Sequence, residues 1–150
     1  MFFYNFISLS NRFKKTKGTV MIKQDYVIRM IQEILSVLVN VILKKKKLRR
    51  LEWEEYDNLT TRILGCSTEQ MLEMSAEMMI ERYANDADKF DKMELAAMYF
   101  IKVADDMKDD NLVFRAKLQQ EALFLLKYIQ EKGGTFSLSR LQIIQLLSTR

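Results

Sequence analysis

Residues 24–43 read QDYVIRMIQEILSVLVNVIL, and this stretch decides the fold class. When successive residues are placed about 100° apart on a helix, the polar side chains fall within an arc of about 120°. These polar side chains are Asp25, Arg29, Gln32, Glu33, Ser36 and Asn40. Apolar side chains cover the other two-thirds, a wider face than an ordinary surface helix shows. We therefore expect this helix to be buried, either in the middle of a helical domain or in an interface with a second copy of the chain.

The rest of the chain also favours helices. It contains no proline and four glycines among 150 residues, although average usage would give about seven and about ten. Because these residues interrupt helices and form turns, their scarcity leaves long segments rich in good helix formers. The composition therefore predicts an all-α fold.

Capping residues divide the chain into helices. Gly65 is a natural residue to follow a helix, and Ser67 and Ser75 precede short apolar segments that carry acids in the first turn. Thr135 or Ser137 begins the last helix. The expected segments are 24–43, 53–64, 67–74, 75–84, 89–107, 112–132 and one ending at 147, and the first two are either one long helix or a hairpin. Short connections then predict an antiparallel bundle of about six helices over residues 21–150, a single domain, with residues 1–20 as an extension outside the fold.

Charge is distributed in blocks along the chain. Residues 1–50 contain twelve Lys and Arg and two acids, a net of +10. Residues 51–110 contain six basic residues and sixteen acids, a net of −10, and residues 111–150 contribute +4. The overall charge of +4 is thus a sum of opposed fields, which bear on partners and association rather than on the fold.

The basic run is the candidate binding site, and its members are Lys44, Lys45, Lys46, Lys47, Arg49 and Arg50. Clustered cations bind nucleic acids or anionic membranes because they displace counterions from phosphates. The same residues also suit a solvated helix end, where cations favour the helix dipole. As a third alternative, the run pairs with the acidic block, within the fold or across a dimer.

The chemistry available to the chain argues against catalysis. It has no histidine, which removes the commonest general base and metal ligand, and one cysteine, Cys66, which excludes an intramolecular disulfide. The acidic turns at 86–91 and 105–110 lack the glycine and the glutamate that a calcium-binding EF-hand loop requires at its sixth and twelfth positions. We expect no enzyme activity, no cofactor and no metal.

Two segments resemble a known family. Residues 24–32, QDYVIRMIQ, and Leu64-Gly65 followed by the short Ser- and Glu-led helices at 67–84 are similar to an uncharacterised bacterial family of helical, tetratricopeptide-like proteins. The resemblance covers about residues 21–84 and implies a soluble all-α fold stacked from helical hairpins. It implies no activity.

These observations predict a non-catalytic helical module for protein–protein interaction or scaffolding in the cytoplasm. The expected partner is a protein that the sequence does not identify, and a homodimer is a further alternative. The rival function is binding to a nucleic acid or an anionic membrane surface through residues 44–50. The single cysteine fits a reducing compartment. The charges follow the apolar start of the chain, which is the reverse of their order in a secretory signal.

Overall fold

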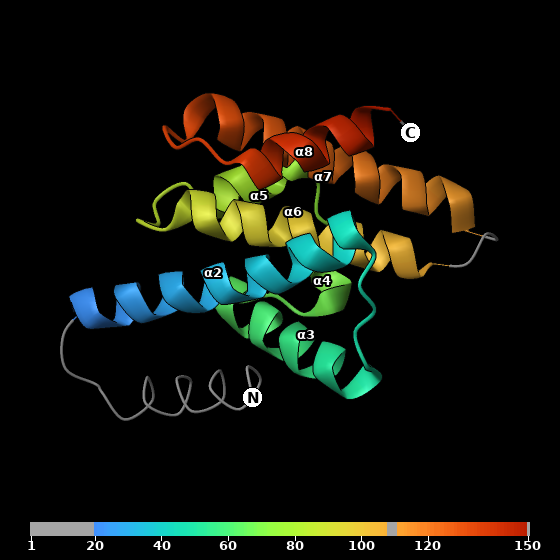
Figure 1. Cartoon of the computed structure of the whole chain (residues 1–150). Coiled ribbons are helices and arrows are strands. Elements are labelled where there is room, and N and C mark those ends of the chain that lie inside the picture. The colour runs from blue at the N-terminus through green and yellow to red at the C-terminus, as the bar shows by residue number, and fades with distance from the viewer. Residues whose placement is uncertain (1–19, 108–110, 150) are drawn as a thin grey trace.

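A computed structural model of the chain describes residues 20–107 and 111–149. The expectation for residues 1–20 therefore falls almost entirely outside the described part. Within that part the protein is all-helical, with seven helices and no strand. The helices, labelled as in Figure 1, are α2 (Val20–Lys44), α3 (Arg50–Leu64), α4 (Thr68–Glu73), α5 (Ala76–Tyr83), α6 (Lys89–Asp106), α7 (Leu112–Lys132) and α8 (Leu138–Ser148). The predicted all-α bundle is confirmed; the finer arrangement of tetratricopeptide-like hairpins is not.

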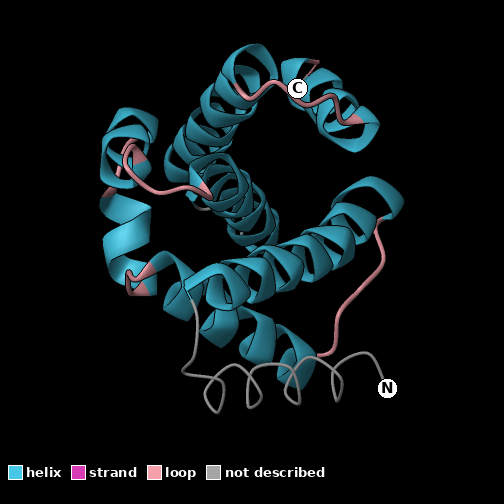
Figure 2. Cartoon of the chain, turned by 90° about the vertical axis from the view of Figure 1, so that its left-hand side faces the viewer, coloured by secondary structure: helices cyan, strands magenta, loops and turns pink. Residues whose placement is uncertain are grey.

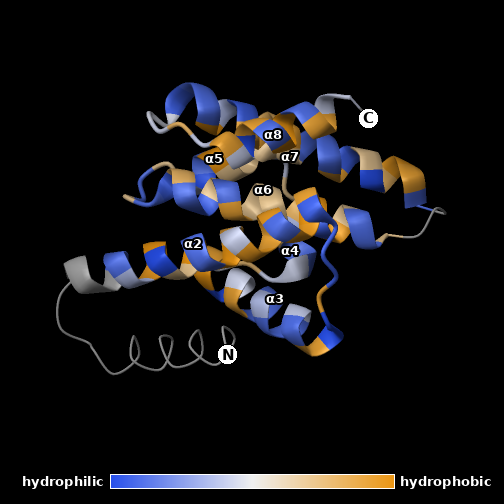
Figure 3. Cartoon of the chain, viewed as in Figure 1, coloured by the Kyte–Doolittle hydropathy of each residue, from blue (hydrophilic) through white to orange (hydrophobic). Residues whose placement is uncertain are grey.

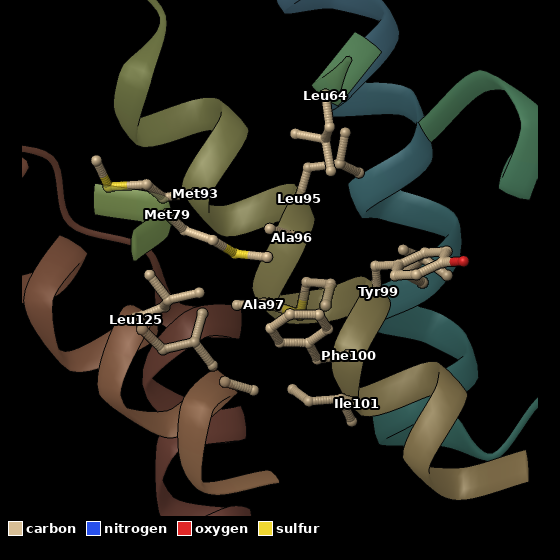
Figure 4. Close-up of a cluster of buried hydrophobic side chains, with 14 of the residues drawn as sticks. Leu64, Met79, Met93, Leu95, Ala96, Ala97, Tyr99, Phe100, Ile101 and Leu125 are labelled. Atoms are coloured by element: carbon tan, nitrogen blue, oxygen red, sulfur yellow. The ribbon is translucent and has the colours of Figure 1, made fainter. Parts of the chain in front are cut away.

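Helix α6 forms the centre of the bundle. It packs against α2, α3, α5 and α7, and Figures 1 and 2 together show the other helices arranged around it. Every residue from Leu95 to Lys102 is buried, so the helix has no exposed face along this stretch. In Figure 4, Ala97 and Phe100 lie toward Leu125 of α7, whereas Leu95 lies beside Leu64 of α3. Small residues on α6 let α7 approach closely, which explains why these two helices share the most extensive contact.

Helix α2 packs onto the bundle through one face only. Met30, Ile31, Ile34, Leu38 and Ile42 are buried, while the apolar residues beside them are only partly covered. The structure thus buries a stripe of this helix rather than its whole apolar surface. By length and composition, residues 24–44 could also cross a membrane, and 28% of their most apolar window is buried here.

The helix ends follow the predicted capping residues. Gly65 adopts a left-handed conformation (φ 71°) after α3 and donates its N–H to the carbonyl of Thr61. Ser67 and Gln70 form a capping box at the start of α4, while Ser75 and Ser137 accept backbone N–H groups at the starts of α5 and α8. Of the two candidates for the last cap, Ser137 is the one used.

A buried ion pair fixes the last helix. Arg140 of α8, which is 2% exposed, lies 3.3 Å from the carboxylate of Glu94 on α6. Its guanidinium also donates to the side-chain oxygen of Gln130 at 2.7 Å and to the carbonyl of Thr135. Burial raises the pKa of Glu94, and the nearby Arg140 opposes that rise. One side chain therefore joins α6, α7 and α8.

One buried hydroxyl in α3 leads to a stability prediction. Thr60 is fully buried, and its hydroxyl has no hydrogen-bond partner among the described residues. An unsatisfied buried hydroxyl costs about 1–3 kcal/mol, so Thr60→Val should raise the free energy of unfolding by about 1 kcal/mol. Urea unfolding measures this change. The neighbouring Thr61 is the control, since its hydroxyl donates to the carbonyl of Asn58 at 3.0 Å. A stabilisation that is equal in Thr61→Val would contradict the explanation.

Candidate functional site

The basic run forms the connection between α2 and α3. Helix α2 ends at Lys44, and Lys45 takes a left-handed backbone conformation (φ 50°), which stops the helix. Adjacent lysine charges repel one another, and the left-handed turn at Lys45 takes Lys45–Lys47 out of the helix. All six candidate residues are exposed. The sequence left open whether residues 24–43 and 53–64 form one long helix or a hairpin. The structure shows two helices, joined by the basic connection.

The six candidate cations divide into two groups. Arg49 lies 2.6 Å from Glu52, and Arg50 lies 3.2 Å from Glu54, so α3 neutralises both arginines. The hydrogen bond from Arg49 lowers the pKa of Glu52. No ion pair within the described residues involves Lys44–Lys47. The basic and acidic blocks thus meet in part, and four lysines keep charge available for a partner.

A hollow of about 470 Å³ lies beside these lysines. Its cations are Lys45, Lys46, Lys47, Lys102 and Arg115, its acids are Asp105 and Asp106, and Val41, Ile42 and Leu48 supply apolar wall. Five cations and two acids give a net charge of +3. The hollow brings together the α2–α3 connection, the end of α6 and the start of α7, three segments that are distant in the sequence. We call this hollow and the Lys44–Lys47 segment the basic end.

Lys102 is the structural cation of the basic end. It is buried, pairs with Asp106 one turn further along α6, and lies with its ammonium 4.6 Å from the centre of the Trp53 ring. A cation over an aromatic face is attracted by the ring electrons, more strongly where water is excluded. Lys102 therefore holds α3 against α6 and leaves the charge of the hollow mainly to the three lysines and Arg115.

Exposed aliphatic side chains lie at the same end of the molecule. Leu112 and Val113, at the start of α7, are 59% and 87% exposed, and Leu51, at the start of α3, is 75% exposed. Figure 3 shows apolar colour at the starts of both helices, at the end where the basic connection runs. Leu112 and Val113 lie within one turn of Arg115, a cation of the hollow, so apolar surface is available close to the basic end.

The other sequence candidates have structural roles. Cys66 is buried, with its sulfur 3.6 Å from the carbonyl of Leu64 and 3.8 Å from the hydroxyl of Tyr83. The ammonium of Lys92 lies 2.8 Å from Asp86 and 3.3 Å from Asp88, so these two carboxylates of the first acidic turn are paired with a lysine. Part of the second acidic turn lies outside the described residues. Among those that are described, no group of acids, cysteine or histidine could hold a metal.

Sequence reasoning found the lysines but missed the residues that complete the hollow. Lys102, Asp105 and Asp106 lie at the end of α6, and Arg115 lies in the first turn of α7. Each is an ordinary charged residue of a helix end, and no spacing relates it to Lys44–Lys47. The hollow holds lysine, arginine and aspartate side chains, which bind charged groups.

Comparison with known proteins gives no further assignment: no family model, no curated protein and no solved structure matches this chain. The resemblance described for residues 21–84 therefore stays a prediction.

Proposed function

We propose that the chain is a non-catalytic helical module that binds another protein through its basic end. The observation that supports this function is the mixed charge of the hollow, in which aspartates lie among lysines and arginine beside exposed aliphatic residues. We include in the proposal the single domain over residues 21–150, the bacterial tetratricopeptide-like family and a cytoplasmic location. The buried free thiol of Cys66 fits a reducing compartment.

The two aspartates favour a protein over a lipid surface or a nucleic acid. A membrane surface or a phosphate backbone presents one sign of charge, which suits the net charge of +3 in the hollow but offers nothing to its two carboxylates, of which Asp106 pairs with Lys102. A protein segment can present carboxylates to Lys45–Lys47 and place neutral groups against the aspartates. Its apolar side chains can cover Leu112 and Val113, and the charges then steer the encounter while apolar burial holds the complex.

Exchanging the lysines tests this function. The full chain is tagged and used to capture partners from a nuclease-treated lysate of its own organism, and association with the captured protein is timed. Replacing Lys44–Lys47 by serine should slow association by about tenfold or more, because steering charges raise association rates by about 10–1,000-fold. Replacing Leu112 and Val113 by serine should speed dissociation instead.

A matched variant controls for net charge. Replacing Lys117, Lys127, Lys132 and Arg62 by serine removes four exposed cations elsewhere and should leave association nearly unchanged. Equal slowing in this variant would overturn the assignment to the basic end. Loss of all capture after nuclease treatment would overturn the protein partner as well.

An anionic membrane surface is the second candidate, favoured by the four lysines without an ion pair and the aliphatic residues at the same end. It predicts that the chain co-sediments with phosphatidylglycerol vesicles, that phosphatidylcholine vesicles leave it in solution, and that the lysine variant is not retained. A homodimer is the third arrangement, and it predicts a sedimentation coefficient that rises with protein concentration.

A further inference from the structure

Helix α7 has a solvent-exposed face with an aromatic residue at its centre. Figure 1 shows α7 along the edge of the bundle, and it packs against α5, α6 and α8 through one side only. The buried residues of that side are Leu118, Ala122, Leu125, Leu126 and Ile129. On the outer side Phe124 is 49% exposed, in the middle of the helix, and Lys117, Gln120 and Glu131 are exposed on the same face.

Two opposite charges lie symmetrically about Phe124. Lys117 precedes it by seven residues and Glu131 follows it by seven. Seven residues are almost two turns, so both charged residues lie within about 20° of the direction of Phe124 and about 10.5 Å from it along the helix. Neither Lys117 nor Glu131 takes part in an ion pair within the described residues. Both charges are therefore available to a partner.

This order of charges is complementary to itself. When a second copy of α7 lies antiparallel against the first, with a two-fold axis beside Phe124, each Lys117 faces Glu131 of the partner subunit. The two Phe124 rings meet at the axis, and a two-fold interface makes every other contact twice. A parallel pair places lysine against lysine and glutamate against glutamate instead, which is unfavourable. The charges therefore select the antiparallel orientation.

Exposed apolar residues extend the same contact. Val113 is 87% exposed and lies on the face of Phe124, eleven residues before it. In the antiparallel arrangement Val113 reaches the end of the partner's α7, where the connection to α8 exposes 72% of Phe136. Aromatic residues near the centre of an interface contribute much of its binding energy, so Phe124 is placed where an aromatic residue is most effective.

We propose that the outer face of α7 is the interface of a symmetric, antiparallel dimer of this chain, centred on Phe124. The dimer goes beyond the function proposed for the basic end and does not use Lys44–Lys47. One helix from each copy buries less than the roughly 1,600 Å² of a standard interface, so we expect a Kd above about 1 µM. Unfolding experiments in dilute solution then report on the monomer.

Sedimentation equilibrium of the full chain tests the proposal at concentrations up to about 1 mM, where a Kd of that size is still detected. The wild-type chain should form a dimer and no larger species, because a two-fold interface is closed. Phe124→Ser should weaken the dimer by about 30-fold or more, as expected for a central aromatic residue. The matched control is Leu51→Ser, which removes another exposed apolar side chain, at the start of α3, and should dimerise normally.

Exchange of the two charges tests the orientation. Lys117→Glu sets acids against acids across the axis, and Glu131→Lys sets lysines against lysines, so each variant alone should dimerise about tenfold or more weakly. A mixture of these two variants restores an opposite charge at both contacts and should associate as tightly as the wild type. Carrying both substitutions in one chain should also restore the dimer. Misfolding of either single variant cannot produce this recovery.

A chain that stays monomeric up to about 1 mM would overturn the proposal. It is also wrong if Phe124→Ser dimerises like the wild type, or if the mixture associates no better than each charge variant alone. Replacing Lys44–Lys47 by serine should leave the dimer intact, and loss of the dimer there would assign the contact to the basic end instead. Capture of a partner protein through the basic end is measured separately, so failure of that function is distinguishable from failure of the dimer.

Discussion

Replacing Arg140 by methionine will lower the free energy of unfolding by about 3–5 kcal/mol at pH 7, the cost of removing one partner of a buried ion pair. Methionine fills much of the space of the aliphatic stem but leaves Glu94 without its cation and the carbonyl of Thr135 without its donor. Because the total free energy of unfolding of a domain is about 5–15 kcal/mol, this substitution removes a large part of the stability. Urea unfolding monitored by circular dichroism measures the change.

The loss should depend on pH. Burial already raises the pKa of Glu94, so the folded state binds its proton more tightly than the unfolded state does. Stability from this group is therefore greatest below the ordinary glutamate range and falls as pH rises toward the folded pKa. Without Arg140 the pKa of Glu94 rises further. The loss of unfolding free energy in Arg140→Met should then be smallest in acid and grow toward neutral pH.

A double variant separates the ion pair from simple packing. Glu94→Gln removes the buried charge, so Glu94→Gln with Arg140→Met should be more stable at pH 7 than Arg140→Met alone, and its deficit should change little with pH. If the double variant is less stable than Arg140→Met and keeps the same pH dependence, the uncompensated charge is not the cause.

Replacing Phe100 by alanine will lower the free energy of unfolding by about 3–5 kcal/mol, because it leaves a cavity in the core. Phe100 is fully buried in the middle of α6, where Figure 4 shows it between Ala97 and Ile101 on the side of α7. The neighbouring helices pack against α6 from several sides, so they cannot all move inward to fill the space.

The chain offers a matched control for this substitution. Phe124 is in α7, and half of its surface is exposed, so Phe124→Ala removes the same atoms without a buried cavity. Its effect should stay below about 1 kcal/mol, as is usual for surface substitutions. Thermal unfolding of both variants measures the difference, and similar losses at the two positions would contradict the placement of α6 at the centre.

Much of the fold could be predicted from local signals. The ends of α3, α4, α5 and α8 coincide with Gly65 and with capping serines, because caps act through hydrogen bonds within a few residues of one another. The extent of α7, Leu112–Lys132, also matched the prediction. These features require no knowledge of what packs where.

The centre of the bundle could not be predicted in the same way. The widest apolar face belongs to α2, and sequence reasoning placed α2 either in the middle of the domain or in an interface with a second copy, yet α6 is the helix with no exposed face over residues 95–102. Helix α6 has a lower mean hydropathy than α2 because it contains seven charged residues, among them Lys102. Small residues are buried because they let neighbouring helices approach closely. Lys102 is buried because it pairs with Asp106 and lies over the ring of Trp53. Both effects depend on neighbours that are remote in sequence.

The candidate sites show the same division. The basic run was visible because it is contiguous, whereas Arg115 and the aspartates of the hollow come from other helices. The position of α8 likewise depends on the contacts of Arg140, which no pattern in the sequence indicates.

Trp53 gives the protein an optical property of its own. It is the one tryptophan of the chain, its ring stacks on Tyr99 with 5.7 Å between centroids, and the ammonium that lies over it belongs to a lysine of the basic end. Indole emission responds to nearby charge and to ring contacts. An occupant of the hollow that displaces Lys102 would therefore change the emission of Trp53.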